Sequence, residues 1–263
     1  MQNRYVCDVG DFGKYGLLNA LSKSEGADKR RLRLGVVWYL VPDEKDNSDG
    51  KHKSYLNPSH VDSGVFRNCN PQLYEKLQKI LERGPTVNAI RKNNIFPTNT
   101  IFFDRPLDYT NMPAIGSRAK EARVEYRSQW LKNAFSKTEG CEIIFFDPDN
   151  GLETSIGRHR EKGPKYVFFD EVNKLWQRNQ SVIIYQHIDH TDKAEKQIRK
   201  RITELKDKLQ PVPEPFALLY RRGTSRAYIV IPAAGQVRIL RNRTERFLQS
   251  GWGHNQIFNP NIY

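Results

Sequence analysis

Three continuous apolar runs most constrain the fold of this 263-residue chain. They are LGVVWYL (34–40), EIIFFD (142–147) and SVIIYQH (181–187), and stretches with helical periodicity separate them. A run that is apolar at nearly every position is typical of a strand buried on both faces, as in a parallel sheet. The alternation of such strands with helices predicts an α/β fold. We expect a doubly wound, mostly parallel, Rossmann-like sheet in a single domain of residues 1–263.

The remaining segments predict the other elements of this fold. Helices are expected at residues 11–24, 71–84, 117–135, 168–179 and 191–209, with a short strand at 100–103. FALLYRR and AYIVIP, joined by GTS, predict an antiparallel strand pair. Residues 250–263 predict an irregular tail. One face of the helix at 117–135 is expected to be buried through Ala119, Ala122, Tyr126, Trp130 and Ala134.

The charge balance predicts a polyanionic partner. The chain has 43 Lys and Arg residues against 30 Asp and Glu residues, a net charge of +13. A field of that sign attracts nucleic acid, DNA or RNA, whose phosphates would supply much of the affinity. Basic residues in several segments are candidates for the contacts, including GRHREK (157–162), RILRNRTER (238–246) and Arg226. The residues that we single out are Arg30, Arg31, Lys51, Arg199, Lys200, Arg221 and Arg222.

Other features of the sequence predict a cytoplasmic protein. No segment approaches the roughly 18 consecutive apolar residues of a membrane helix, and the N-terminal residues have no apolar stretch typical of a signal peptide. Cys7, Cys69 and Cys141 are far apart and odd in number. They therefore predict neither a disulfide framework nor a metal-binding pair.

The segment IIFFDPDNGLE (143–153) is the strongest candidate for a site. Its apolar residues lead directly into Asp147, and Asp149 and Glu153 follow within seven residues. A carboxylate at the end of a buried strand needs a partner, and ligands of doubly wound sheets bind at that edge. Asp147 could accept a hydrogen bond from the amine of a base. Alternatively, all three carboxylates could hold Mg²⁺ for phosphodiester hydrolysis. A simple polar turn would explain the same residues without a function.

Three further segments offer candidate residues. The loop after Leu40 carries Asp43, Glu44 and Asp49, although it lacks the glycine spacing of a phosphate-binding loop. In VGDFGKYG (9–16), Asp11 is a candidate helix cap, and Lys14 is a candidate contact to phosphate. In YQHIDH (185–190), two histidines and an aspartate follow a strand, as a metal site or as structural residues.

Several of these segments also resemble known families. NRYVCDVGDFGKYGLL, LGVVWYLVPDE, FFDPDNGLE and SVIIYQH resemble a bacterial family with the signature FDPDNGLE, to which no activity is assigned. More distantly, the chain is similar to the ribosomal-RNA adenine-N6 methyltransferases, which are Rossmann-like and depend on S-adenosylmethionine. Those proteins carry Asp-Pro-Pro-Tyr at the end of a strand, where this chain has Asp147, Pro148, Asp149 and Asn150, and they end in a strand pair.

The methyltransferase resemblance implies a cofactor and roles for particular residues. S-adenosylmethionine would be held by the loop after Leu40, Asp147 would accept from the target amine, and Lys14 would contact phosphate. The sequence departs from the pattern in two places: Asn150 replaces the aromatic residue, and the Gly-rich cofactor loop is missing. The alternatives are a Mg²⁺-dependent nuclease that uses Asp147, Asp149 and Glu153, and a nucleic-acid-binding module without catalysis.

Overall fold

The computed structural model describes residues 1–24, 29–43, 50–209 and 214–263. Within them, seven strands form one mixed sheet in the order β2-β1-β3-β6-β8-β7-β9. The strands are β1 (Leu34–Trp38), β2 (Ile101–Phe103), β3 (Ile143–Asp147), β6 (Ser181–His187), β7 (Phe216–Tyr220), β8 (Arg226–Ile231) and β9 (Phe258–Ile262). Two short parallel strands, β4 (Gly151–Leu152) and β5 (Tyr166–Val167), pair with each other beside it.

The first half of the sheet is parallel and the second half is antiparallel. β2, β1, β3 and β6 run in the same direction, and β8 pairs antiparallel to both β6 and β7. β8 thus lies between β6 and β7, and β9 pairs with the far side of β7. The predicted α/β sheet with an antiparallel C-terminal strand pair is confirmed.

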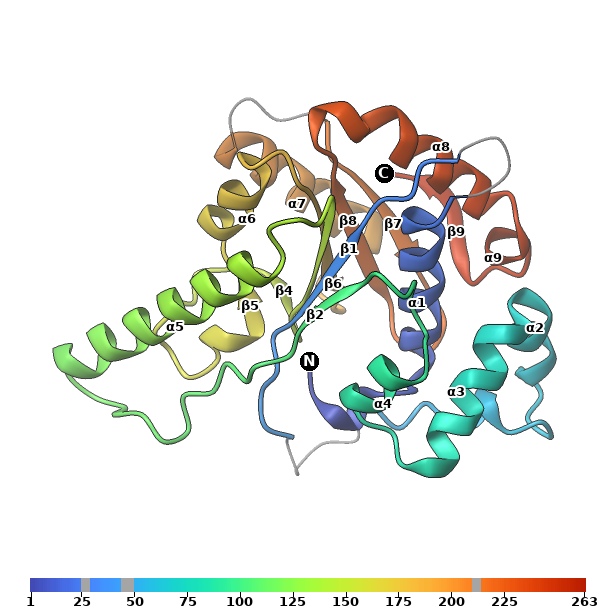
Figure 1. The fold of residues 1–263 in the computed structure, drawn as a ribbon, viewed down its shortest axis with the longest axis horizontal. Coiled ribbons are helices and arrows are strands. Elements are labelled where there is room, and N and C mark those ends of the chain that lie inside the picture. Colours follow the sequence, from blue (N-terminus) through green and yellow to red (C-terminus); the bar gives the residue numbers. More distant parts are fainter. Residues whose placement is uncertain (25–28, 44–49, 210–213) are drawn as a thin grey trace.

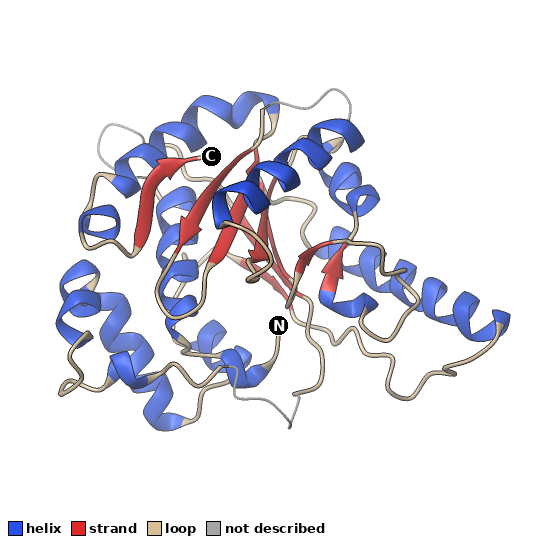
Figure 2. Ribbon diagram, turned by 180° about the vertical axis from the view of Figure 1, so that it is seen from behind, coloured by secondary structure: helices blue, strands red, loops and turns tan. Residues whose placement is uncertain are grey.

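Helices cover both faces of the sheet (Figures 1 and 2). One face packs against a layer that contains α1 (Val9–Ser22), α3 (Pro71–Arg83), α8 (Val237–Leu248) and α9 (Gly251–His254). The opposite face packs against α5 (Ser117–Lys137), α6 (Phe169–Trp176) and α7 (Ala194–Lys208). Two smaller helices, α2 (Ser63–Cys69) and α4 (Val87–Lys92), lie near α3. None of the described helices is both long and apolar enough to cross a membrane.

The helix ends follow local chemistry. Asn70 caps α3, because its side chain accepts from the backbone N–H of Leu73 at 3.0 Å and Pro71 occupies the first turn. The cap of α1 is Asp8, whose carboxylate accepts from Gly10 N–H at 3.1 Å. The alternative that Asp11 caps this helix is therefore wrong. Ser117 is the first residue of α5, but it makes no side-chain cap.

The predicted buried face of α5 is wrong in part. Its buried residues include Arg123 and Arg127, whereas Tyr126 is exposed. The guanidinium of Arg127 donates to both carboxylate oxygens of Glu171, at 2.6 and 2.9 Å, and this pair is fully buried. Because Glu171 on α6 neutralises Arg127, the helix turns a charged residue toward the interior.

The prediction of an irregular tail is also wrong. Residues 250–263 form α9 and β9, and β9 closes the edge of the sheet beside β7. Phe258 is fully buried against Phe247 and Tyr220. The proline and the two asparagines of FNPNIY hide this strand in the sequence, and an edge strand tolerates proline because one of its sides forms no ladder.

Candidate functional site

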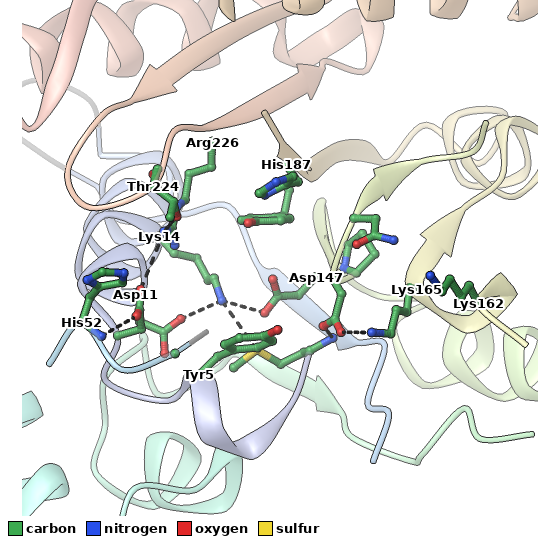
Figure 3. Close-up of a pocket in the computed structure, with 17 residues that line it drawn as sticks. Tyr5, Asp11, Lys14, His52, Asp147, Lys162, Lys165, His187, Thr224 and Arg226 are labelled. Atoms are coloured by element: carbon green, nitrogen blue, oxygen red, sulfur yellow. Dashed lines mark hydrogen bonds and ion pairs between the residues drawn. The ribbon is translucent and has the colours of Figure 1, made fainter. Parts of the chain in front are cut away.

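A cavity of about 330 Å³ opens at the carboxyl ends of the parallel strands. Its walls come from α1, from the loops after β3 and β6, and from the turn between β7 and β8 (Figure 3). This is the edge at which doubly wound sheets bind their ligands, and the volume lies within the roughly 300–1,000 Å³ of small-molecule pockets. The lining residues are Met1, Tyr5, Asp8, Asp11, Lys14, Gly50, His52, Asp147, Pro148, Asp149, Asn150, Lys162, Lys165, Tyr185, His187, Thr224 and Arg226.

Lys14 joins two carboxylates at the floor of this cavity. Its Nζ lies 2.8 Å from Asp11 Oδ1 and 2.8 Å from Asp147 Oδ2. All three side chains are at least 95% buried. Figure 3 shows the ammonium of Lys14 between the carboxylates, with Asp147 at the centre of the cavity. The apolar run of β3 therefore delivers Asp147 to the cavity, as predicted, and α1 delivers its counterion.

Asp11 is held in place by three donors. Besides Lys14, the Tyr15 hydroxyl donates to Asp11 Oδ2 at 2.8 Å, and the backbone N–H of Cys7 donates to the same oxygen at 3.1 Å. Cys7 has a left-handed backbone with φ of 67°, an uncommon conformation for a residue with a side chain. Lys14 is thus held between Asp11, which these donors fix in place, and Asp147.

The buried charges shift the acidities of this group. Burial raises the pKa of Asp147, and the neighbouring ammonium of Lys14 offsets this only in part. Burial alone would lower the pKa of Lys14, but Asp11 and Asp147 outweigh it and raise that pKa. Lys14 is therefore a permanent cation at neutral pH. It presents an N–H donor to Asp147.

Asp149 is satisfied by a separate set of groups. It forms an ion pair with the amino nitrogen of Met1 at 2.5 Å, accepts from Gln2 Nε2 at 2.7 Å, and lies 3.6 Å from Lys165 Nζ. Burial opposes its charge, but these neighbours outweigh burial and lower the pKa of Asp149. Asp149 thus joins the first residues of the chain to the wall of the cavity.

A second ion pair borders the cavity at the start of α1. The guanidinium of Arg226 lies 3.7 Å from Asp8 and stacks on the ring of Tyr220. It also donates to the backbone oxygen and the hydroxyl of Thr224. A Cβ at Gly10 would lie only 1.2 Å from Arg226 Nη1. Glycine at this position is therefore required for Arg226 to reach the cavity.

The three carboxylates predicted to hold Mg²⁺ do not come together. Glu153 accepts from the backbone N–H of Phe169 at 2.8 Å and borders a different groove, beside α6 and α7. Across the described ranges, no group of three or more His, Cys, Asp or Glu side chains is placed to hold a metal ion. This also applies to His187, Asp189 and His190. The described donor set therefore does not fit a Mg²⁺ site.

The predicted place for S-adenosylmethionine is the loop after Leu40, and only part of this loop lies within the described residues. Met1 and Gln2 pack beside the ends of β1 and β3 and are 3% and 0% exposed. The amino nitrogen of Met1 donates to the Tyr39 carbonyl oxygen, and its own carbonyl accepts from Val41. Asp43 is exposed and its carboxylate accepts from the backbone of Arg4. Glu44 and Asp49 lie outside the described residues.

Most of the predicted nucleic-acid contacts lie elsewhere on the molecule. Arg30 pairs with Glu142, Arg221 pairs with Glu195, and Arg222 donates to the Asn255 carbonyl. Arg31, Arg199 and Lys200 are exposed and do not line the cavity, and Lys51 lies between two lining residues, Gly50 and His52. In the segment RILRNRTER, the buried guanidinium of Arg243 binds the carbonyl oxygens of Leu21 and Arg30.

Part of the cavity lining was not predicted from the sequence. Residues 1–5 and Asp8 received no role, although Met1, Tyr5 and Asp8 line it. Asp8 could have been recognised as the cap from its place before VGDFGKYG, a helical segment. No local signal could have shown that the first residues of the chain bind Asp149.

Neither a known protein family nor a curated protein sequence matches this chain.

Proposed function

We propose that the protein binds nucleic acid and accepts an unpaired base in the cavity, with the exocyclic amine of the base donating to Asp147. One observation carries the proposal: a buried carboxylate at the floor of the cavity already accepts from an amine, Lys14 Nζ, at 2.8 Å. A carboxylate has two oxygens that can each accept hydrogen bonds. Lys14 engages Oδ2, and we assign Oδ1 to the base.

The walls of the cavity suit a nucleotide in two further respects. Tyr5 and Tyr185 border it, and stacking of a base on an aromatic ring contributes about 1–3 kcal/mol. Lys162, Lys165 and Arg226 supply positive charge at its walls, and phosphate groups pair with such cations. The lining therefore offers a stacking surface, an amine acceptor and phosphate-binding groups within one cavity.

The scaffold also supports this proposal. The resemblance to adenine-N6 methyltransferases implies an Asp-Pro segment at a strand end and a C-terminal strand pair, and both features are present. Methyl transfer is not part of the proposal, because the Gly-rich cofactor loop of that family is missing from this chain. Cleavage with Mg²⁺ has less support than base binding, because Glu153 lies in another groove.

Binding of labelled single strands tests the proposal. We expect fluorescence anisotropy to show tighter binding of oligonucleotides rich in adenine or cytosine than of those rich in thymine or uracil, which lack an exocyclic amine. One hydrogen bond to a charged group contributes about 1.5–3 kcal/mol. Asp147→Asn should abolish this preference, whereas Asp108→Asn, which alters a carboxylate remote from the cavity, should retain it. Absence of binding at low salt, or equal affinity for all bases, would refute the proposal.

The fold of Asp147→Asn should survive the change. Burial raises the pKa of Asp147 in the folded protein, so the removal of its charge relieves an unfavourable desolvation, and the Asn amide oxygen can still accept from Lys14. Lys14 also keeps Asp11 as its partner. A loss of base preference in this variant will therefore report recognition and not unfolding, as urea denaturation of both proteins can verify.

A further inference from the structure

The surface beside the cavity carries cations that no described carboxylate neutralises. Loop 157–165, GRHREKGPK, contains four basic residues and one glutamate. Lys162 and Lys165 line the cavity, and Arg160 lies on the same loop, exposed to solvent. Arg160 and Lys162 make no ion pair with any described carboxylate; Arg158, in contrast, pairs with Asp170.

The loop is fastened to the first turns of α5, which extend this surface. The Tyr109 hydroxyl donates to the Arg158 carbonyl at 3.0 Å, Arg123 to the His159 carbonyl at 3.1 Å, and Arg127 to the Gly163 carbonyl at 3.0 Å. Figure 1 shows this part of α5 projecting from the body of the molecule, with the segment before it alongside. The loop therefore has a fixed position on the helix.

Lys120 on α5 completes the basic surface. Lys120 lies close enough to His159 to affect its acidity. Desolvation lowers the pKa of His159, and the charges of Arg160, Lys120 and Arg123 lower it further. Lys120 is exposed, and it too has no ion-pair partner among the described residues. On α7, Lys196, Arg201 and Lys206 pair with carboxylates, as Arg158 and Lys165 do on the loop.

We infer that a nucleic-acid strand leaving the cavity crosses loop 157–165 and the first turns of α5, with its phosphates against Lys162, Arg160 and Lys120. This inference rests on the proposed function, and it assigns a polynucleotide, rather than a free nucleotide, as the ligand. The backbone of the loop is held in place before binding by its three hydrogen bonds to Tyr109 and α5, so that phosphate binding there needs ordering of side chains but not of the loop backbone. Each neutralised phosphate releases counterions and makes the affinity depend on salt.

A charge-reversal variant tests the path of the strand. We expect Lys120→Glu/Arg160→Glu to weaken binding of a single-stranded 16-mer by about tenfold or more, and to reduce the slope of log K against log salt by about 1.4, the equivalent of two phosphates. Binding of adenosine 5′-monophosphate, measured by calorimetry, should not change, because both residues lie outside the cavity. Lys79→Glu/Arg83→Glu on the exposed side of α3 changes the net charge equally and is the control.

The outcomes separate this inference from the proposed function. If the wild-type protein binds neither the mononucleotide nor the 16-mer, the proposed function fails. If it binds both, but Lys120→Glu/Arg160→Glu behaves like the α3 control, the proposed path of the strand is wrong. The proposed binding of a base in the cavity then still stands. Equal binding of poly-glutamate and the 16-mer would make this an acidic-protein site and would also overturn the inference. Lys120→Gln/Arg160→Gln provides the same comparison, with about half the loss, if charge reversal impairs folding.

Discussion

Lys14 balances the charge of the cavity floor, because two buried carboxylates share its ammonium. We expect Lys14→Met to lower the free energy of unfolding at pH 8 by about 3–5 kcal/mol, since it leaves buried charge unpaired. Lys79→Met, at an exposed position of α3, should change stability by less than about 0.5 kcal/mol. Urea denaturation measures both.

The pH dependence of Lys14→Met has a definite sign. The pKa of Lys14 is raised above its ordinary value of 10.5. A group with a raised pKa in the folded state contributes stability that is fully present below the ordinary value and is lost as the pH rises through the folded value. The difference in unfolding free energy between wild type and variant should therefore be constant between about pH 8 and pH 10 and should shrink above it. A constant difference up to about pH 12 would contradict the buried ion pair.

Gly10 controls the access of Arg226 to the cavity. We expect Gly10→Ala to displace the guanidinium, because the new Cβ would lie 1.2 Å from Nη1. The loss of one charged contact to a phosphate should weaken binding of the 16-mer by roughly tenfold or more, and we expect Arg226→Met to have a similar effect. Gly64 lies in a helix with open space around it. Gly64→Ala should therefore leave binding unchanged, and a similar loss in both variants would contradict this role of Gly10.

At the scale of the elements, α5 depends on its buried ion pair with α6. Arg127→Met leaves Glu171 buried without its counterion, although Tyr39 and the Phe168 N–H still donate to it. We expect a loss of about 3–5 kcal/mol in unfolding free energy, and recovery of much of it in Arg127→Met/Glu171→Leu. Arg118→Met, on the exposed part of α5, is the matched control. A double variant no more stable than Arg127→Met would contradict this account.

The elements also show what sequence patterns can and cannot predict. The runs ending at Trp38, Asp147 and His187 are strands because continuous apolar residues suit a sheet covered on both faces. The buried face of α5 was misjudged because Arg127 is neutralised by Glu171, 44 residues away in sequence. β9 was missed because its strand pairing with β7 overrides weak local propensity.

The candidate site shows the same limit of sequence patterns, which do not predict contacts between residues far apart in the chain. Asp147 was predicted because a local pattern, an apolar run followed by an acid, places it at the sheet edge. Its pairing with Lys14 joins residues 133 positions apart, and no spacing rule connects them. The contact between Met1 and Asp149 is equally remote in sequence. Sequence patterns therefore predicted which strand ends border the cavity, but not which side chains meet there.

For the whole molecule, the packing of the first residues beside the ends of β1 and β3 leads to a prediction about cofactors. Because Met1 and Gln2 are buried there, we expect calorimetry to detect no heat of binding for S-adenosylmethionine at concentrations up to about 1 mM, a range that covers weak complexes of about −4 kcal/mol. A saturable isotherm with 1:1 stoichiometry would contradict this expectation, and it would restore methyl transfer as a candidate activity.

The walls of the cavity come from stretches spread over residues 1–226, and Arg226 on one wall lies more than 200 positions from Asp8 on another. Such distant pairings form slowly during folding, because long chain segments must be closed first. A nascent chain therefore has no binding site until β8 has emerged from the ribosome and joined the sheet. If an oligonucleotide binds this cavity as we propose, it will stabilise only a fold in which β8 has joined the sheet, so that ligand protection during refolding marks that step.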